Sequence, residues 1–261
     1  MPIEKQAAIR AARKEKTVRV LVACEESQAV TIAFRALGHE AYSCDILPCS
    51  GGHPEWHYQG DVLPLIASVF KPKWDLIIAH PPCTRLCNSG VRWLSERNLW
   101  KEMEEAAEFF IKFLTADCKK ICIENPIMHK YARKIIIDSG LLFEFTVKKN
   151  KQYSQIVHPH WFGDGETKAT CLTLKGLTCL EPTNQVFGRG NKIHFMSPGK
   201  DRAKKRSETF PGMAAAMALF WGTERAASMP QENGPKDNIE TCNTLCNSAR
   251  HESRAENINR S

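Results

Sequence analysis

The sequence lacks the apolar runs of a membrane or exported protein. No stretch approaches the roughly 18 consecutive apolar residues that a membrane-spanning helix needs, and no apolar segment of the signal-peptide kind follows the charges near the N-terminus. These absences predict a cytoplasmic protein without a membrane partner. The remaining composition, 43% hydrophobic and 25% charged over 261 residues, is ordinary for a globular chain with one main domain.

The first turn of the expected fold lacks glycine. After an apolar segment that begins at Val18, the sequence reads Cys24-Glu25-Glu26-Ser27-Gln28. A dinucleotide-binding fold needs glycine here, because only glycine lets the backbone approach a pyrophosphate closely. NAD and FAD are therefore not expected as cofactors.

Eleven cysteines are present, but their positions do not favour disulfides. Several fall inside expected strands, at Cys24, Cys44, Cys122 and Cys171. In a chain without an export signal, free buried thiols are the usual state of such residues. We therefore expect no disulfide bonds.

A zinc site is the alternative use of cysteine and histidine. Cys44, Cys49, His53 and His57 have side chains of the kinds that bind zinc. Structural zinc sites space their ligand pairs more tightly, and here one member falls in an expected strand and the others in a Gly/Pro-rich loop. We predict a packed thiol with loop histidines, and no metal.

Apolar runs alternate with helical patterns along most of the chain. Strands are expected at Val18–Cys24, Ala41–Ile46, Trp74–His80, Ile121–Ile123, Leu142–Val147 and Ala169–Leu174, and helices at Gln28–Leu37, Leu99–Leu114 and Met213–Trp221, with Pro48–Gln59 as a loop. Alternation of this kind indicates an α/β fold with a doubly wound, mostly parallel sheet.

Acidic residues near two early strand ends suit a nucleoside cofactor. Asp45 follows Cys24 by 21 residues, close to the spacing of about 20 at which an acid meets a nucleotide ribose. Asp61, in the short element Gly60-Asp61-Val62, is either an acceptor for an exocyclic amine or a surface aspartate.

Two later strands end in reactive side chains followed by proline. His80-Pro81-Pro82-Cys83 closes one apolar run, and Glu124-Asn125-Pro126 closes another about forty residues later. The carboxyl ends of parallel strands are where α/β sheets carry out chemistry. A thiolate beside a carboxylic acid can add covalently to a pyrimidine and then release it.

The net charge of +7 is concentrated in one segment. Between Arg189 and Arg206 the chain carries seven basic residues against Asp201. A solvated basic surface and contact with nucleic-acid phosphates are equally compatible with this run.

Four segments, in this order and spacing, carry a family resemblance. They are His80-Pro81-Pro82-Cys83, Ile123-Glu124-Asn125-Pro126, Phe162 to Leu172, and Pro211 to Ala218. They resemble the Pro-Cys catalytic motif, the Glu-Asn-Val motif, the segment before a late strand and the closing helix of C5-specific DNA cytosine methyltransferases, in the compact form common in bacteriophages and prophages. The resemblance covers about Val18 to Trp221.

The resemblance implies methyl transfer from S-adenosylmethionine to C5 of a cytosine that has left the DNA duplex. Cys83 would attack C6 while Glu124 hydrogen-bonds N3 and the exocyclic amine. Asn125 would support the active loop, and Lys168 or Thr170 would lie near the base. The resemblance and the strand ends together assign the cofactor to Cys24, Glu25, Ser27, Asp45, Ile46, Asp61, Val62 and Pro81, and DNA to Arg189, Lys192, Lys204, Lys205 and Arg206.

The sequence departs from the family pattern in three places. Ala23-Cys24-Glu25-Glu26-Ser27 stands where the family has Phe-x-Gly-x-Gly, and Lys168 replaces an arginine. Only about thirty residues separate the late strand from the closing helix, so the target-recognition domain is expected to be minimal or absent. The expected organisation is an arm at 1–17, a catalytic domain at 18–174, an irregular basic insertion at 175–206, a closing helix at 207–222 and a disordered tail at 223–261.

Three alternatives remain open at this point. An amino-group methyltransferase also has two prolines at a strand end, but with an aromatic residue where Cys83 stands and an acid or amide where His80 stands. An enzyme that acts on a free nucleotide, or that uses another one-carbon donor, would need the same nucleophile. A DNA-binding relative without catalytic activity is the third alternative, and cofactor binding would separate it from the others.

Overall fold

The computed structural model describes residues 17–67, 69, 71–145, 153–187, 190, 196–197, 199 and 202–222. For 143–144 and 203–205 it describes the backbone alone. The expected tail at 223–261, nearly all of the expected arm, and the predicted DNA contacts Arg189 and Lys192 lie outside the described residues. The predicted contacts Lys204 and Lys205 have no described side chains.

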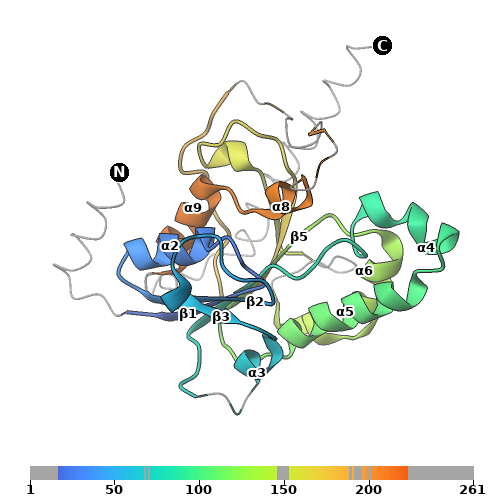
Figure 1. The fold of residues 1–261 in the computed structure, drawn as a ribbon, viewed down its shortest axis with the longest axis horizontal. Coiled ribbons are helices and arrows are strands. Elements are labelled where there is room, and N and C mark those ends of the chain that lie inside the picture. Colours follow the sequence, from blue (N-terminus) through green and yellow to red (C-terminus); the bar gives the residue numbers. More distant parts are fainter. Residues whose placement is uncertain are drawn as a thin grey trace, which may run out of the picture.

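The described strands form one seven-stranded sheet in the order β3-β2-β1-β4-β5-β7-β6 (Figure 1). Their bounds are β1 Arg19–Ala23, β2 Glu40–Asp45, β3 His57–Gln59, β4 Leu76–Ala79, β5 Ile121–Pro126, β6 Gln155–Val157 and β7 Thr170–Lys175. The first five pair in parallel, and β7 runs antiparallel between β5 and β6. The predicted α/β class with a doubly wound, mostly parallel sheet is confirmed.

Helices cover both faces of the sheet. They are α2 Ala29–Ala36, α3 Leu63–Ile66, α4 Arg92–Glu96, α5 Trp100–Leu114, α6 Lys130–Asp138, α8 Arg202–Ser207 and α9 Pro211–Trp221, with short 3-10 turns at Pro54–Trp56, Asn88–Gly90, Leu141–Glu144 and Pro159–Trp161. Figure 1 shows α2 beside α9, with α5 and α6 on the other side of the sheet.

Alternation along each strand separates two cores. Val20 and Val22 of β1 pack with α2 and α9, whereas Leu21 and Ala23 pack with α5 and α6. Successive side chains of a strand point to opposite faces, so a continuous apolar strand supplies both cores. Alanines and methionines of α9 are buried and contact α2, which explains why that helix is apolar on nearly all sides.

Several local predictions were wrong. The described part of the expected strand Leu142–Val147 is not a strand: Leu141–Glu144 forms a 3-10 turn, residues 146 and 147 lie outside the described residues, and the strand beside β7 is β6. The predicted loop Pro48–Gln59 contains β3, an edge strand of three residues that is too short to show alternation. The sequence reading also missed α4 and α6, and the insertion expected to be irregular contains α8.

One described cysteine forms a disulfide bond that the sequence did not predict. Cys179 is disulfide-bonded, although no disulfide was expected. The expectation rested on cysteines inside strands, and Cys179 lies in the loop after β7. Eight described cysteines are free, among them the four assigned to strands.

The described residues contain neither a membrane-spanning helix nor a cluster of metal ligands. No helix in them is long and apolar enough to cross a membrane. No group of three or more potential metal ligands occurs among them.

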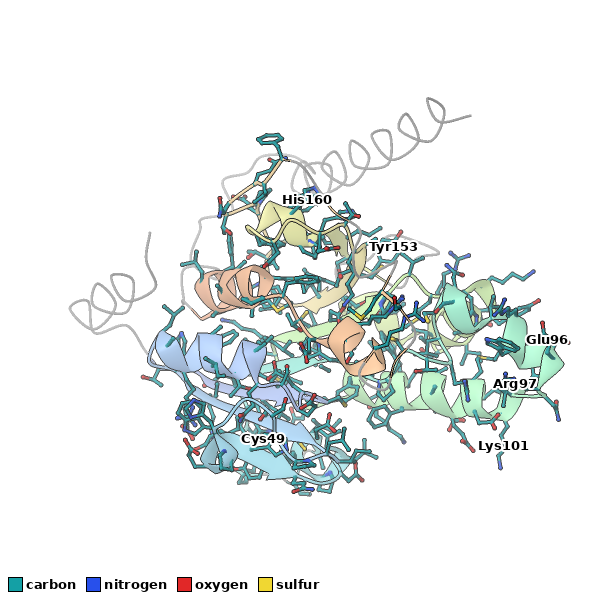
Figure 2. The ribbon with its side chains drawn as sticks, turned by 45° about the horizontal axis from the view of Figure 1, so that its top comes forward. Cys49, Glu96, Arg97, Lys101, Tyr153 and His160 are labelled. Carbon is teal, nitrogen blue, oxygen red and sulfur yellow. The ribbon has the colours of Figure 1, made fainter. Side chains whose placement is uncertain are left out.

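The residues considered for zinc have other partners. The Nδ1 atom of His57 lies 2.8 Å from the Ser43 hydroxyl, and its Nε2 atom lies 2.9 Å from the Leu47 carbonyl. The His53 ring stacks on Trp56 at 3.9 Å between centroids. Cys49 lies in the loop after β2 (Figure 2).

Candidate active site

The strand order brings the carboxyl ends of β2, β1, β4 and β5 together along one edge of the sheet. β1 lies between β2 and β4, and the chain order reverses there, because β2 and β3 extend the sheet to one side and β4 and β5 to the other. Ligands of open α/β sheets bind outside the carboxyl ends of the strands at such a reversal. Cys83 follows β4, and Glu124 lies near the end of β5, the neighbouring strand.

The loop after β4 turns sharply at Cys83. Pro81 is buried, and the amides of Leu86 and Cys87 both donate to the Cys83 carbonyl at 2.9 Å. A 3-10 turn, Asn88–Gly90, follows at once. The Cys83 side chain is partly exposed, as a nucleophile must be to meet a substrate.

His129, which the sequence reading missed, holds this loop against the end of β5. Its amide donates to the Leu86 carbonyl at 3.0 Å, and its Nε2 atom lies 2.8 Å from the Arg85 carbonyl. The Ala132 amide donates to Nδ1 at 3.2 Å, so Nδ1 is the acceptor and Nε2 carries the proton. No sequence motif signals this role, because Arg85 and His129 are 44 residues apart.

Gly90 is expected to be essential for the shape of the same loop. A Cβ atom there would lie 2.3 Å from the backbone oxygen of Thr84, so Gly90→Ala must push that segment aside. A misplacement of about 1 Å can cost about 100-fold in rate, and we expect a loss of that order with a modest fall in thermal stability. Activity and melting temperature measure the two effects. Gly165→Ala is the matched control, because its Cβ would meet no atom within 4 Å, and equal losses in both variants would contradict the prediction.

Glu124 is buried and paired with His80, which the sequence did not mark as functional. The His80 Nδ1 atom lies 3.1 Å from Oε2 of Glu124, and the two side chains are 10% and 11% exposed. The His80 amide donates to the Ala23 carbonyl, which places His80 between β1 and β5. Its Nε2 atom is buried without a hydrogen-bond partner among the described residues, so it can serve a bound ligand.

Charges around Glu124 favour its ionised form. Burial raises the pKa of the carboxyl, but the hydrogen bond from His80 and the positive charges of Lys168 and His80 outweigh burial, and the net pKa is lowered. The neighbouring Cys87 and burial raise the pKa of the Cys83 thiol, Glu124 raises it further, and the positive charge of Lys168 opposes the rise. Three residues that the sequence assigned to catalysis are thus close enough to act on one another.

Lys168 connects the active site to the basic segment. Its Nζ atom donates to the Arg206 carbonyl at the end of α8 at 2.9 Å. Asn125 is buried, donates to the Pro126 carbonyl, and leaves its Oδ1 atom without a partner among the described residues. His129 contacts the active loop directly, and the support predicted for Asn125 stays a prediction.

The residues predicted to bind the nucleoside part of a cofactor also come together. Burial raises the pKa of the Cys24 thiol, and the charges of Asp45 and Asp61 raise it further, so the three side chains share one neighbourhood. Each aspartate uses Oδ1 to accept a backbone amide two residues on, at 2.9 Å for Asp45 and 3.0 Å for Asp61. Ile46 is 74% exposed beside Asp45, whereas Val62 is buried.

The turn from Cys24 to Gln28, which contains no glycine, has two other residues with positive φ. Cys24 and Gln28 both adopt the left-handed backbone region, at φ 58° and 60°. Gln28 fixes the turn to the loop after β2, since its Oε1 accepts the His53 amide at 3.1 Å and its Nε2 donates to the His53 carbonyl at 2.8 Å. Ser27 is partly exposed at this turn.

The Glu25 carboxylate accepts hydrogen bonds from the first turn of α2. One carboxylate oxygen accepts the Val30 amide at 2.6 Å, and the other accepts the amide and hydroxyl of Thr31 at 3.3 and 2.8 Å. Burial raises the pKa of this carboxyl, and the charge of His80 and these hydrogen bonds oppose the rise. Glu25 therefore satisfies the first turn of α2, and this occupies the carboxylate that was assigned to the cofactor.

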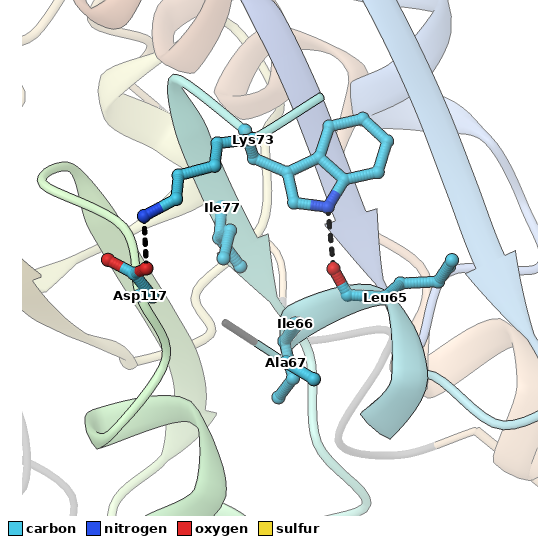
Figure 3. Close-up of a pocket in the computed structure, with 7 residues that line it drawn as sticks. Leu65, Ile66, Ala67, Lys73, Ile77 and Asp117 are labelled. Atoms are coloured by element: carbon cyan, nitrogen blue, oxygen red, sulfur yellow. Dashed lines mark hydrogen bonds and ion pairs between the residues drawn. The ribbon is translucent and has the colours of Figure 1, made fainter. Parts of the chain in front are cut away.

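A small hollow lies away from this site (Figure 3). Its lining includes Trp74, whose indole donates to the Leu65 carbonyl at 2.8 Å, and the ion pair of Lys73 with Asp117. Lys73 and Asp117 precede β4 and β5, so the hollow is at the amino edge of the sheet. Its volume of about 10 Å³ holds a water molecule at most.

Comparisons with known proteins add the following. No protein-family model matches the sequence, and no curated protein does. A candidate DNA modification methyltransferase encoded within an E. coli prophage is similar in structure, with a TM-score of 0.41 and 16% identity over 65% of this chain and 52% of that one. The Entamoeba histolytica methyltransferase EhMeth has a TM-score of 0.44 and 16% identity, over 71% of this chain and 61% of its own.

The present chain thus spans 52% and 61% of the lengths of these two proteins. Likeness of this degree does not identify a reaction. We base the functional proposal on the residues of this chain.

Proposed function

We propose that the protein transfers a methyl group from S-adenosylmethionine to C5 of cytosine in DNA, through a covalent bond between Cys83 and C6 of the base. The observation that carries the proposal is the meeting of Cys83, Glu124 and Lys168, which come from three separate segments and act electrostatically on one another. A thiol, a carboxyl and a cation at the carboxyl edge of a parallel sheet suit covalent addition to a pyrimidine.

Each side chain has a chemical task in this proposal. The Cys83 sulfur bonds to C6, and the electrons of the C5–C6 double bond move into the ring. Glu124 hydrogen-bonds N3 and the exocyclic amine, and a proton passes from His80 Nδ1 through the Glu124 carboxylate to N3 as negative charge reaches the ring. Lys168 stabilises the same charge. After methylation, the C5 proton passes to solvent water, the C5–C6 double bond re-forms from the C5–H electron pair, and the sulfur–carbon bond breaks to leave Cys83 as a thiolate.

The residues at the ends of β1, β2 and β3 suit the cofactor. Asp45 would hold the ribose hydroxyls, Asp61 the adenine amine, and the exposed Ile46 one face of the adenine ring. Ser27 and Pro81 would border the methionine part, while Glu25 stays engaged with α2. S-adenosylmethionine supplies an electrophilic methyl group.

DNA would approach from the side of α8. Arg206 lies beside Lys168, and Arg189, Lys192, Lys204 and Lys205 belong to the same basic segment. Contacts from such residues to phosphates fix position without reading sequence. The flipped cytosine costs a few kcal/mol to unstack, which contacts at Glu124 and Lys168 would offset.

The identity of the methylated nucleoside tests the proposal. The protein is incubated with S-adenosylmethionine carrying a labelled methyl group and with random-sequence duplex DNA, which is then digested to nucleosides and separated by mass. We expect labelled 5-methylcytosine. N4-methylcytosine or N6-methyladenine would show an amino-group methyltransferase, and label on free cytosine nucleotide alone would show the nucleotide alternative. A protein that binds DNA but not the cofactor by calorimetry would be a non-catalytic relative.

A further inference from the structure

Aromatic and basic side chains come together on α4 and at the first turn of α6. The central guanidinium carbons of Arg92 and Arg97 lie over the Trp93 ring, 4.3 and 4.1 Å from its centroid. On α6, the Lys130 amine lies 4.9 Å from the centroid of the Tyr131 ring. These five residues, called here the α4–α6 surface, lie outside the basic segment that includes α8.

The chain connections place the α4–α6 surface at the carboxyl edge of the sheet. α4 follows the loop that leaves the end of β4, and α6 begins soon after the end of β5. The helix between them, α5, contacts both, and its first residue, Trp100, meets the Tyr131 ring edge-on at 5.1 Å between centroids. The surface is therefore at the same edge as the candidate active site, and Figure 1 shows α4 and α6 on the same side of the molecule.

The α4–α6 surface is also joined to the loop that carries Cys83. The His129 amide donates to the Leu86 carbonyl of that loop at 3.0 Å, and α6 begins at the residue after His129. A bridge between Cys87 and Met128 adds a second link. A molecule bound on this surface would thus contact chain segments that border the nucleophile.

The cations of the surface are not neutralised by neighbouring carboxylates. None of the ion pairs between described residues includes Arg92, Arg97 or Lys130. By contrast, Lys101 of α5 and Lys134 of α6 each pair with an acid four residues on. The two arginines and Lys130 are therefore free to bind an external anion, whereas their neighbours already have partners.

Stacking on an aromatic ring prepares a guanidinium for a phosphate. Its N–H donors lie in the plane of the group, so packing one face on a ring leaves the donors at the edge available. The ring also restricts the side chain before binding, which lowers the entropy lost on association. Glu96 is the acid of α4 (Figure 2), and the cations of Arg92 and Arg97 outnumber it.

We propose that the α4–α6 surface binds phosphates of the DNA duplex that flanks the target base. Figure 1 shows α4 and α8 well apart, so the two contacts would hold the duplex at different places along its length. Phosphate contacts fix the position of a duplex without reading its sequence. The role of the surface in presenting the target base rests on the proposed function, whereas its binding of DNA is measured without cofactor.

The salt dependence of DNA affinity tests the proposal. Fluorescence anisotropy measures the binding of a labelled random-sequence duplex to the full chain between about 0.05 and 0.2 M KCl. The logarithm of the affinity falls with the logarithm of the salt concentration by about 0.9 for each phosphate contact. We expect Arg92→Ala combined with Arg97→Ala to reduce this slope by about 1.8, and to weaken binding at low salt by about tenfold or more.

The matched control is Lys101→Ala combined with Lys134→Ala, which removes the same charge from neighbouring helices (Figure 2) and should leave the slope nearly unchanged. Arg92→Lys combined with Arg97→Lys keeps both charges and should keep most of the slope. A wild-type slope in the arginine-to-alanine variant, or an equal reduction in the lysine control, would overturn the proposal.

Folding of each variant is checked by circular dichroism. If the double alanine variant does not fold, Arg97→Gln alone replaces it, because glutamine keeps a long side chain on α4. This variant should reduce the slope by about 0.9. An unchanged slope in folded Arg97→Gln would again overturn the proposal.

Failure of the proposed function would show in a different way. Loss of slope in the arginine variants, with no labelled 5-methylcytosine formed by the wild type, would support the DNA-binding surface and remove the reaction. If 5-methylcytosine is formed, Arg92→Ala combined with Arg97→Ala should raise KM for DNA with little change in kcat. An unchanged KM together with an unchanged slope would support the reaction and overturn the surface.

Discussion

Replacing Cys83 with alanine is expected to eliminate the covalent adduct with DNA that contains 5-fluorocytosine, and to lower methyl transfer by on the order of 10⁴-fold or more. Fluorine at C5 cannot leave as a proton, so the sulfur–carbon bond of a methylated base persists and survives denaturants. Without the thiol no such bond can form. Denaturing gel electrophoresis of labelled DNA measures the adduct.

The matched control is Cys49→Ala, which removes another partly exposed thiol. Cofactor and DNA affinity should be nearly unchanged in Cys83→Ala, because its side chain is placed on the target base and not on the cofactor. An adduct of normal yield in Cys83→Ala would show that another cysteine attacks the base. Cys87, whose amide donates to the Cys83 carbonyl in the same loop, would then be the first candidate.

Glu124→Gln is expected to lower the rate by about 100- to 10,000-fold, the range found for removal of an acid–base group. Glutamine keeps the size of the side chain and can still accept the hydrogen bond of His80, but it cannot pass a proton to N3. The main loss should appear in kcat. Glu96→Gln, at an exposed position of α4 labelled in Figure 2, is the control and should retain full activity.

The same substitution has a consequence for stability in acid. The folded-state pKa of Glu124 is lowered below its unfolded value of about 4.3, so the ionised carboxyl stabilises the fold above that value. This contribution is lost as the pH falls through the folded pKa. Urea unfolding between pH 3 and 7 should therefore show a smaller loss of stability in Glu124→Gln than in the wild type. An identical pH dependence would argue against the His80–Glu124 ion pair.

The sequence predicted the sheet well where strands are long and buried on both faces. β1, β4 and β5 are continuous apolar runs, and a run of this kind bounded by polar residues has few alternatives. It predicted less well where structure depends on neighbours. β6 has three residues and becomes a strand by pairing with β7, a property that no local pattern reveals.

By itself, the sequence determined the fold class and the two reactive strand ends, because apolar periodicity and proline act within a few residues of the chain. Only the tertiary structure decided which side chains surround Cys83 and Glu124. His80 pairs with Glu124, His129 holds the loop, and Glu25 accepts the Val30 amide at the start of α2. These contacts join segments that strand order brings together, and the chemical environment of a side chain is set by such neighbours in space.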